Sequence, residues 1–144
     1  MTIEVPIVVA EGCSLPKYQT SGAAGLDLCL AEDVELEPMQ RSVVPTGIRL
    51  AIPEGYEGQV RPRSGLAARQ GIAMVNSPGT IDSDYRGEVQ LVLINFGSSV
   101  VKLVKGERVG QIVFCPVARA QLLLVDSLDE TERNEGGFGS TGRR

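Results

Sequence analysis

Short segments of alternating apolar and polar residues follow one another along most of the chain, and turns rich in proline and glycine separate them. Successive side chains of a β-strand point to opposite faces, so this alternation is typical of half-buried strands. The pattern predicts strands at residues 3–9, 26–31, 34–36, 41–44, 47–52, 56–61, 88–95, 100–103, 108–114 and 118–125.

Turn signals such as Pro53-Glu54-Gly55 recur about every 8–12 residues, a spacing typical of antiparallel sandwiches and barrels. Only residues 64–70 favour a helix, with Ser64 expected as its N-cap and Gly71 as its stop. There is no internal repeat and no dividing linker. The sequence therefore predicts an all-β fold: a jelly-roll-like antiparallel sandwich or barrel with one short helix.

The apolar pattern ends near Asp129, and a polar, glycine-rich stretch follows. This predicts a β-domain over residues 1–128 and a flexible C-terminal arm over 129–144 that closes over a bound ligand. Within the arm, residues 136–142 combine four glycines with Ser140 and Thr141, which suits a polyphosphate. Phe138 has the flat ring needed to cover a nucleobase. A disordered charged tail is the alternative interpretation.

Composition narrows the function further. The chain has 144 residues and a net charge of −4, which disfavours a nucleic-acid partner. It contains no histidine, so triads that depend on histidine are excluded. No apolar run approaches a membrane span, and no secretory signal opens the chain. Three cysteines without C-x-x-C spacing favour neither disulfides nor zinc, so we expect a protein of the reducing cytoplasm.

Two internal segments carry charged residues where a β-protein usually has core or plain turns. Asp27 stands between two leucines, where it either faces solvent or holds water molecules around Mg²⁺ beside a polyphosphate. Arg63 and Ser64 come directly before and at the expected helix start, a combination that favours an anion. The plainer interpretation is a capping serine beside a surface arginine.

Residues 76–87 form a more elaborate hairpin than a simple connection needs. Asp82 is the best candidate for a general base, and Tyr85 has a flat face that suits a sugar. Asn76 has an amide with both donor and acceptor capacity. Further along, Gln111 interrupts an apolar strand and needs a ligand or backbone partner. We expect Glu107 and Arg108, by contrast, to be ordinary turn charges.

Together and in order, five segments resemble the five motifs of the trimeric dUTP pyrophosphatases (dUTPases). They are residues 24–28 (Ala-Gly-Leu-Asp-Leu), 62–67 (Pro-Arg-Ser-Gly-Leu-Ala), 79–87, 106–111 (Gly-Glu-Arg-Val-Gly-Gln) and 133–142. Two departures are visible: Leu26 replaces a frequent aromatic, and Asn134-Glu135 replaces smaller residues. Neither carries a catalytic atom.

The resemblance implies the hydrolysis of dUTP to dUMP and pyrophosphate, which lowers dUTP and supplies dUMP for thymidylate synthesis. Asp82 would activate the water that attacks the α-phosphorus, and Asp27 would hold waters of a Mg²⁺ ion. The triphosphate would be bound by Arg63, Ser64, Gly65 and Gln111.

For the nucleoside, the resemblance implies that Tyr85 packs under the deoxyribose and that Gln90 is a further candidate contact. Uracil would be read by Asn76 and by the main chain of Gly79, Thr80, Ile81 and Asp82. The arm would contribute Arg133 to the γ-phosphate, Phe138 to the uracil ring, and Gly139, Ser140 and Thr141 to the bound substrate. The family is a homotrimer in which the arm of one subunit closes a site built by the other two.

Three alternatives stay open beside this interpretation. A dCTP deaminase has a related fold but needs a glutamate on the strand after the hairpin, where this chain has Val92. A dUTPase-like binding or regulatory module would keep the fold without the chemistry. A purely structural jelly roll would leave the hairpin and the arm unexplained.

Overall fold

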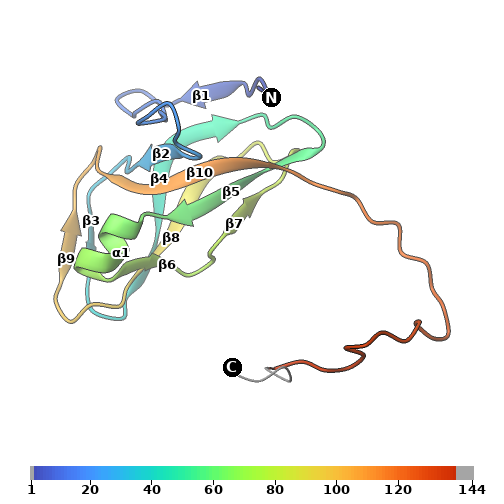
Figure 1. Cartoon of the computed structure of the whole chain (residues 1–144). Helices are drawn as coiled ribbons and strands as arrows, with labels where there is room; N and C mark the ends of the chain where they lie inside the picture. The colour runs from blue at the N-terminus through green and yellow to red at the C-terminus, as the bar shows by residue number, and fades with distance from the viewer. Residues whose placement is uncertain (1, 139–144) are drawn as a thin grey trace.

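Two four-stranded antiparallel sheets and one small two-stranded sheet form the body of the protein (Figure 1). The computed structural model describes residues 2–138. The first sheet contains, in order, β1 (Ile7–Val9), β4 (Arg41–Leu50), β8 (Glu88–Asn95) and β6 (Ile72–Met74). The second contains β2 (Leu26–Cys29), β10 (Arg108–Pro116), β5 (Tyr56–Pro62) and β7 (Gly79–Ile81). The small sheet pairs β3 (Val34–Leu36) with β9 (Val101–Leu103).

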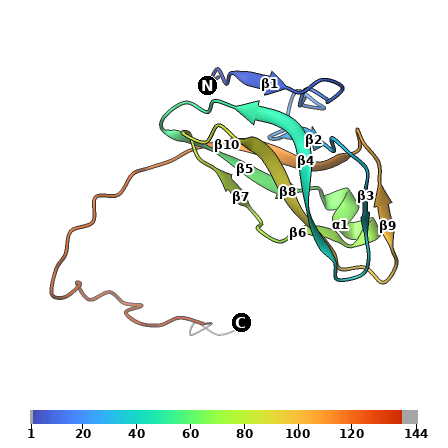
Figure 2. The ribbon, with the colours of Figure 1, turned by 180° about the vertical axis from the view of Figure 1, so that it is seen from behind.

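The hydrophobic core lies between the two larger sheets, which Figure 2 shows from behind. Val89, Leu91 and Leu93 of β8 are completely buried and alternate with more exposed residues, as expected for a strand with one face inward. Leu28 and Ile112 belong to the same core from the second sheet. The predicted all-β sandwich is confirmed.

The short helix α1 (Ser64–Gln70) has the bounds that the sequence predicts, and it connects β5 to β6. Gly71 ends it in the left-handed region, at φ +70°, and its N–H reaches back to Ala67 and Leu66. The prediction of Ser64 as N-cap is wrong. Arg63 occupies that position, and no side chain caps the helix. The reason is that Arg63 has an extended backbone while Ser64 is already helical, so the helix begins one residue earlier than a cap at Ser64 implies.

Strand β4 joins two segments that the sequence predicts separately. It runs continuously through Pro45 and Gly47, and its register with β8 shifts between Pro45 and Arg49. Gly47 adopts φ +71° there, which glycine tolerates best. A bulge of this kind breaks the alternation of the sequence without ending the strand.

The predicted strand at residues 118–125 is wrong. After β10 the chain leaves the body as an extended segment, and residues 118–125 pair with no strand (Figure 1). Leu122 and Leu124 are 92% and 99% exposed. The alternating pattern of a strand is present, but in this structure the segment pairs with no strand of its own chain. The boundary between domain and arm at residue 129 stays a prediction.

No helix among residues 2–138 is long and apolar enough to cross a membrane.

Candidate active site

Five of the predicted site residues line one cavity of about 340 Å³, called here the arginine cavity. They come from three places in the fold: β2, the junction of β5 with α1, and β10. The predicted members are Asp27, Arg63, Ser64, Gly65 and Gln111, and the other lining residues are Gln19, Ala23, Ala24, Gly25 and Arg108.

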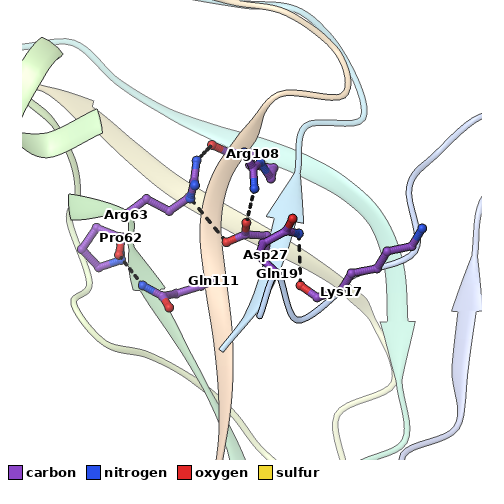
Figure 3. A network of polar contacts seen from close by, with 7 residues as sticks. All are labelled: Lys17, Gln19, Asp27, Pro62, Arg63, Arg108 and Gln111. Carbon is purple, nitrogen blue, oxygen red and sulfur yellow. Dashed lines mark hydrogen bonds and ion pairs between the residues drawn. The ribbon is translucent and has the colours of Figure 1, made fainter. Parts of the chain in front are cut away.

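Asp27 lies between two arginines at the centre of this cavity (Figure 3). Its Oδ1 is 3.3 Å from Nε of Arg63, and its Oδ2 is 3.0 Å from Nη1 of Arg108. The Asp27 side chain is only 12% exposed, so solvent screens these pairs less than it screens surface pairs. Two guanidinium groups against one carboxylate leave one net positive charge in the cavity. That balance suits an anionic ligand.

Gln111 finds a backbone partner, one of the two options that the sequence left open. Its Nε2 donates to the Pro62 carbonyl at 3.1 Å, which ties β10 to the end of β5 (Figure 3). Its Oε1 faces Gly25, where an added Cβ would lie only 2.6 Å away. Gly25 therefore leaves the room that the Gln111 amide occupies.

The residues of the arginine cavity offer little to a metal ion on their own. Asp27 is the one carboxylate among the residues lining it. Nowhere in residues 2–138 do three metal-binding side chains gather. A lone carboxylate still fits a hydrated Mg²⁺ that arrives with phosphate oxygens, because this ion keeps several of its waters.

Asp82 lies in a different cavity, of about 660 Å³, called here the hairpin cavity. The lining combines Glu54, Glu57, Asp84, Arg86 and Arg119 with Asp82 and with less polar neighbours. Arg86 holds the tip of the hairpin together, because its Nη1 donates to the Ser83 carbonyl at 2.6 Å and to the Tyr85 carbonyl at 2.9 Å.

Tyr85 folds back over the base of the hairpin. Its hydroxyl donates to the Glu88 carbonyl at 3.0 Å. A Cβ at Gly87 would collide with the Tyr85 ring, so the fold of this side chain depends on a glycine there. The phenol is thereby satisfied within the chain, and Tyr85, 43% exposed, has ring surface left for a ligand.

The remaining predicted nucleoside contacts lie on β7 and nearby. Gly79, Thr80 and Ile81 form β7, which is the last strand of its sheet, so one of its edges faces no other strand in the described chain. Asn76 lies beside Gly79: a Cβ on that glycine would be 2.9 Å from the Asn76 Nδ2. Gln90 is exposed on β8 and lines neither cavity.

The two cavities lie at opposite ends of β5. Ile81 pairs with Gly58, so Asp82 lies near Glu57 at the start of that strand, whereas Arg63 follows its end. From Glu57 to Arg63 is six residues, which at the rise of a β-strand places Asp82 and Arg63 about 20 Å apart. One chain therefore does not bring its own Asp82 to its own arginines.

The described residues of the arm, up to Phe138, line neither cavity. Phe138 is fully exposed, and Arg133 donates from Nε to the Gly136 carbonyl at 2.7 Å, a local turn contact. Gly139, Ser140 and Thr141 lie outside the described residues.

The structure also corrects the interpretation of one residue. Arg108 is not an ordinary turn charge, because it pairs with Asp27 across 81 positions of sequence. Apart from the family resemblance, only the nearby Gln111 indicated a site on this strand. Nothing in the local sequence distinguishes Arg108 from Glu107, which does bond within its own turn, to the N–H of Val104.

Comparison with known proteins identifies the family. A family model described as dUTPase matches residues 11–142. A deoxyuridine 5'-triphosphate nucleotidohydrolase of Anaeromyxobacter sp. is 57% identical over 99% of this chain and 99% of its own. One from Beijerinckia indica is 54% identical over 92% of this chain and 86% of its own.

Among solved structures, the dUTPase of Staphylococcus bacteriophage 80alpha with dUpNHpp superposes with a TM-score of 0.91. It is 26% identical and covers 98% of this chain and 99% of its own. The family model and these relatives span nearly the whole chain, and the chain belongs to the dUTPase family.

Proposed function

We propose that this protein hydrolyses dUTP to dUMP and pyrophosphate. The observation that carries the proposal is the arginine cavity, in which Arg63 and Arg108 surround Asp27 and leave a positive balance for a polyphosphate. The family and the dUTPase structure with dUpNHpp support uracil deoxyribonucleotides as the substrate class.

In this proposal, Asp82 is the general base that orients the attacking water toward the α-phosphorus. Arg63, Ser64, Gly65 and Gln111 hold the triphosphate chain. Hydrolysis of such an anion depends mainly on positioning and charge neutralisation, so the absence of histidine is no obstacle. A Mg²⁺ ion bound with the nucleotide would neutralise phosphate oxygens, and Asp27 would hold it through water.

The nucleoside end is proposed to lie along β7. The free edge of residues 79–81 offers backbone donors and acceptors to uracil, with the Asn76 amide beside it. Tyr85 would place its ring under the deoxyribose, where an added hydroxyl finds no room. The arm residues Arg133 and Phe138, with Gly139, Ser140 and Thr141, would then close over the substrate, and Gln90 stays a candidate contact.

The active site is proposed to form between chains of a homotrimer. A distance of about 20 Å between Asp82 and Arg63 is too long for both to act on one triphosphate, so they must come from different subunits. A trimer with cyclic symmetry would repeat one interface three times and would so form three such sites.

The exposed apolar segment that precedes the arm supports the same assembly. Leu122, Leu123 and Leu124 extend away from their own body, and burying each is worth about 1.5–3 kcal/mol. An apolar groove of about 640 Å³ lies beside β1, lined in part by Leu15 and Tyr18. We assign this groove to the segment 122–124 of another copy.

The pathway role and the compartment follow from the chemistry. Removing dUTP and releasing dUMP would supply thymidylate synthesis with its substrate. All three cysteines are free thiols, which supports a reducing cytoplasm.

The test is pyrophosphate release from dUTP, dCTP, dTTP and UTP with Mg²⁺, for the wild type and for Asp82→Asn. We expect release from dUTP alone, and its loss in the variant. If dUTP gives no pyrophosphate, a binding or regulatory role takes the place of hydrolysis. The deaminase alternative predicts ammonia from dCTP, but β8 carries the apolar Val92 where that reaction needs an acid.

A further inference from the structure

Arg108 contacts both charged partners in the arginine cavity, and it does so with two different groups. Its side chain donates from Nη1 to Oδ2 of Asp27 at 3.0 Å. Its main-chain carbonyl accepts a hydrogen bond from Nη1 of Arg63, also at 3.0 Å. Because Arg63 and Asp27 contact each other as well, the three residues close a ring (Figure 3).

A local irregularity of β10 makes this double contact possible. The register of β10 with β2 shifts between Arg108 and Gly110, so the strand is bulged where the ring forms. Bulges re-aim side chains next to active sites. Here the guanidinium of Arg108 lies on Asp27 while its carbonyl remains available to Arg63.

The charges of the ring suggest what Arg108 contributes. Asp27 has the least exposed side chain of the three, 12% against 30% for Arg63 and 45% for Arg108. If Arg63 turned to a phosphate and Arg108 were absent, the charge of Asp27 would be uncompensated. Asp27 would then repel the phosphate, because like charges at short range repel. Arg108 keeps a cation on Asp27 while Arg63 is engaged.

We propose that Arg108 is a positioning residue of the triphosphate site, which neutralises and orients Asp27 and supports Arg63. It acts through these two residues rather than by contacting phosphate itself. The inference rests on the proposed function, because it takes a nucleoside triphosphate as the ligand of the arginine cavity.

A double-mutant cycle measured by calorimetry tests this directly. The probe is dUpNHpp with Mg²⁺, titrated into the full-length protein. Arg108→Gln keeps the backbone carbonyl but removes the charge on Asp27, so we expect binding weaker by about tenfold. Arg108→Lys keeps a cation and should recover binding to within about threefold of the wild type.

The second half of the cycle repeats both substitutions in an Asp27→Asn background. With no carboxylate to neutralise, Arg108→Gln should then change the dissociation constant by less than about twofold. The matched control is Lys102→Gln, which also removes a cation from an ion pair, with Glu35 at 2.9 Å, but outside this cavity. It should bind dUpNHpp as the wild type does.

Each contrary result has a separate meaning. A tenfold loss in both backgrounds would show that Arg108 contacts phosphate directly, and would overturn the positioning role. Unchanged binding in Arg108→Gln would overturn it as well. If the glutamine variant fails to fold, judged by its melting temperature, Arg108→Met removes the same charge and takes its place in both backgrounds. If the wild type itself does not bind dUpNHpp, the proposed function fails, and the role of Arg108 fails with it. If the wild type binds, the results above test Arg108 alone.

Discussion

At the scale of single residues, the site depends on contacts that join distant parts of the sequence. The residue types of Asp27, Arg63 and Gln111 indicate their chemistry, and the structure brings all three into one cavity. The role of Arg108 could not be predicted, because its partner is 81 positions away and a turn arginine needs no partner. The type of a residue predicts which chemistry it can perform, whereas the pairing of strands β2 and β10 determines which residues come into contact.

Gly25 provides a sharp test at this scale. A Cβ there would lie 2.6 Å from Oε1 of Gln111, so Gly25→Ala should displace that amide from its place in the arginine cavity. We expect kcat/KM for dUTP to fall about 10- to 100-fold, since displacements near 1 Å have costs of that order. Steady-state pyrophosphate release measures it.

Gly22→Ala is the matched control for this substitution, because no atom lies within 4 Å of a Cβ at Gly22. Its kcat/KM should match that of the wild type. Equal activity of both alanine variants would show that Gln111 does not need its present position.

At the scale of elements, the sequence predicted most of the strands and missed those that depend on their neighbours. Alternation identifies β8 with the bounds that the structure shows. Strands β6 and β7 have three residues each, too few for a pattern, and β7 follows a turn-rich segment. The segment 118–125 shows the opposite case, because its strand pattern is clear but it pairs with no strand of its own chain.

The apolar segment that precedes the arm should therefore be needed for assembly rather than for folding of one subunit. We expect Leu122→Ser combined with Leu124→Ser to lower the mass in light scattering from about three times 15.3 kDa toward that of a single chain.

Val104→Ser is the comparison for that variant, since Val104 is a 52% exposed apolar residue of the turn after β9. It should stay trimeric. A trimer of unchanged stability in the double serine variant would contradict the docking of this segment on another copy.

The end of the arm should serve catalysis rather than stability. Deleting every residue after Asn134 removes the fully exposed Phe138 together with Gly139, Ser140 and Thr141. We expect a melting temperature within about 2 °C of the wild type and turnover lower by about 100-fold or more, because a closing segment excludes water and completes the site. An unchanged rate in the truncated protein would rule out the lid.

At the scale of the whole molecule, the structure separates two groups of residues that one reaction needs together. The arginine cavity holds the residues proposed to bind phosphate, and the hairpin cavity holds Asp82 at the far end of β5. Sequence motifs show their order along the chain but not the distance between them. Because of that distance, the proposed reaction requires an assembly of several chains.

Complementation between two inactive variants tests this central claim most directly. Asp82→Asn and Arg63→Ala, co-expressed with different tags and purified through both, give trimers that contain both variants. If each site takes Arg63 from one chain and Asp82 from another, every mixed trimer has one intact site, and we predict roughly a third of wild-type pyrophosphate release from dUTP. If mixed trimers are as inactive as either variant alone, each site belongs to a single chain and the account is contradicted.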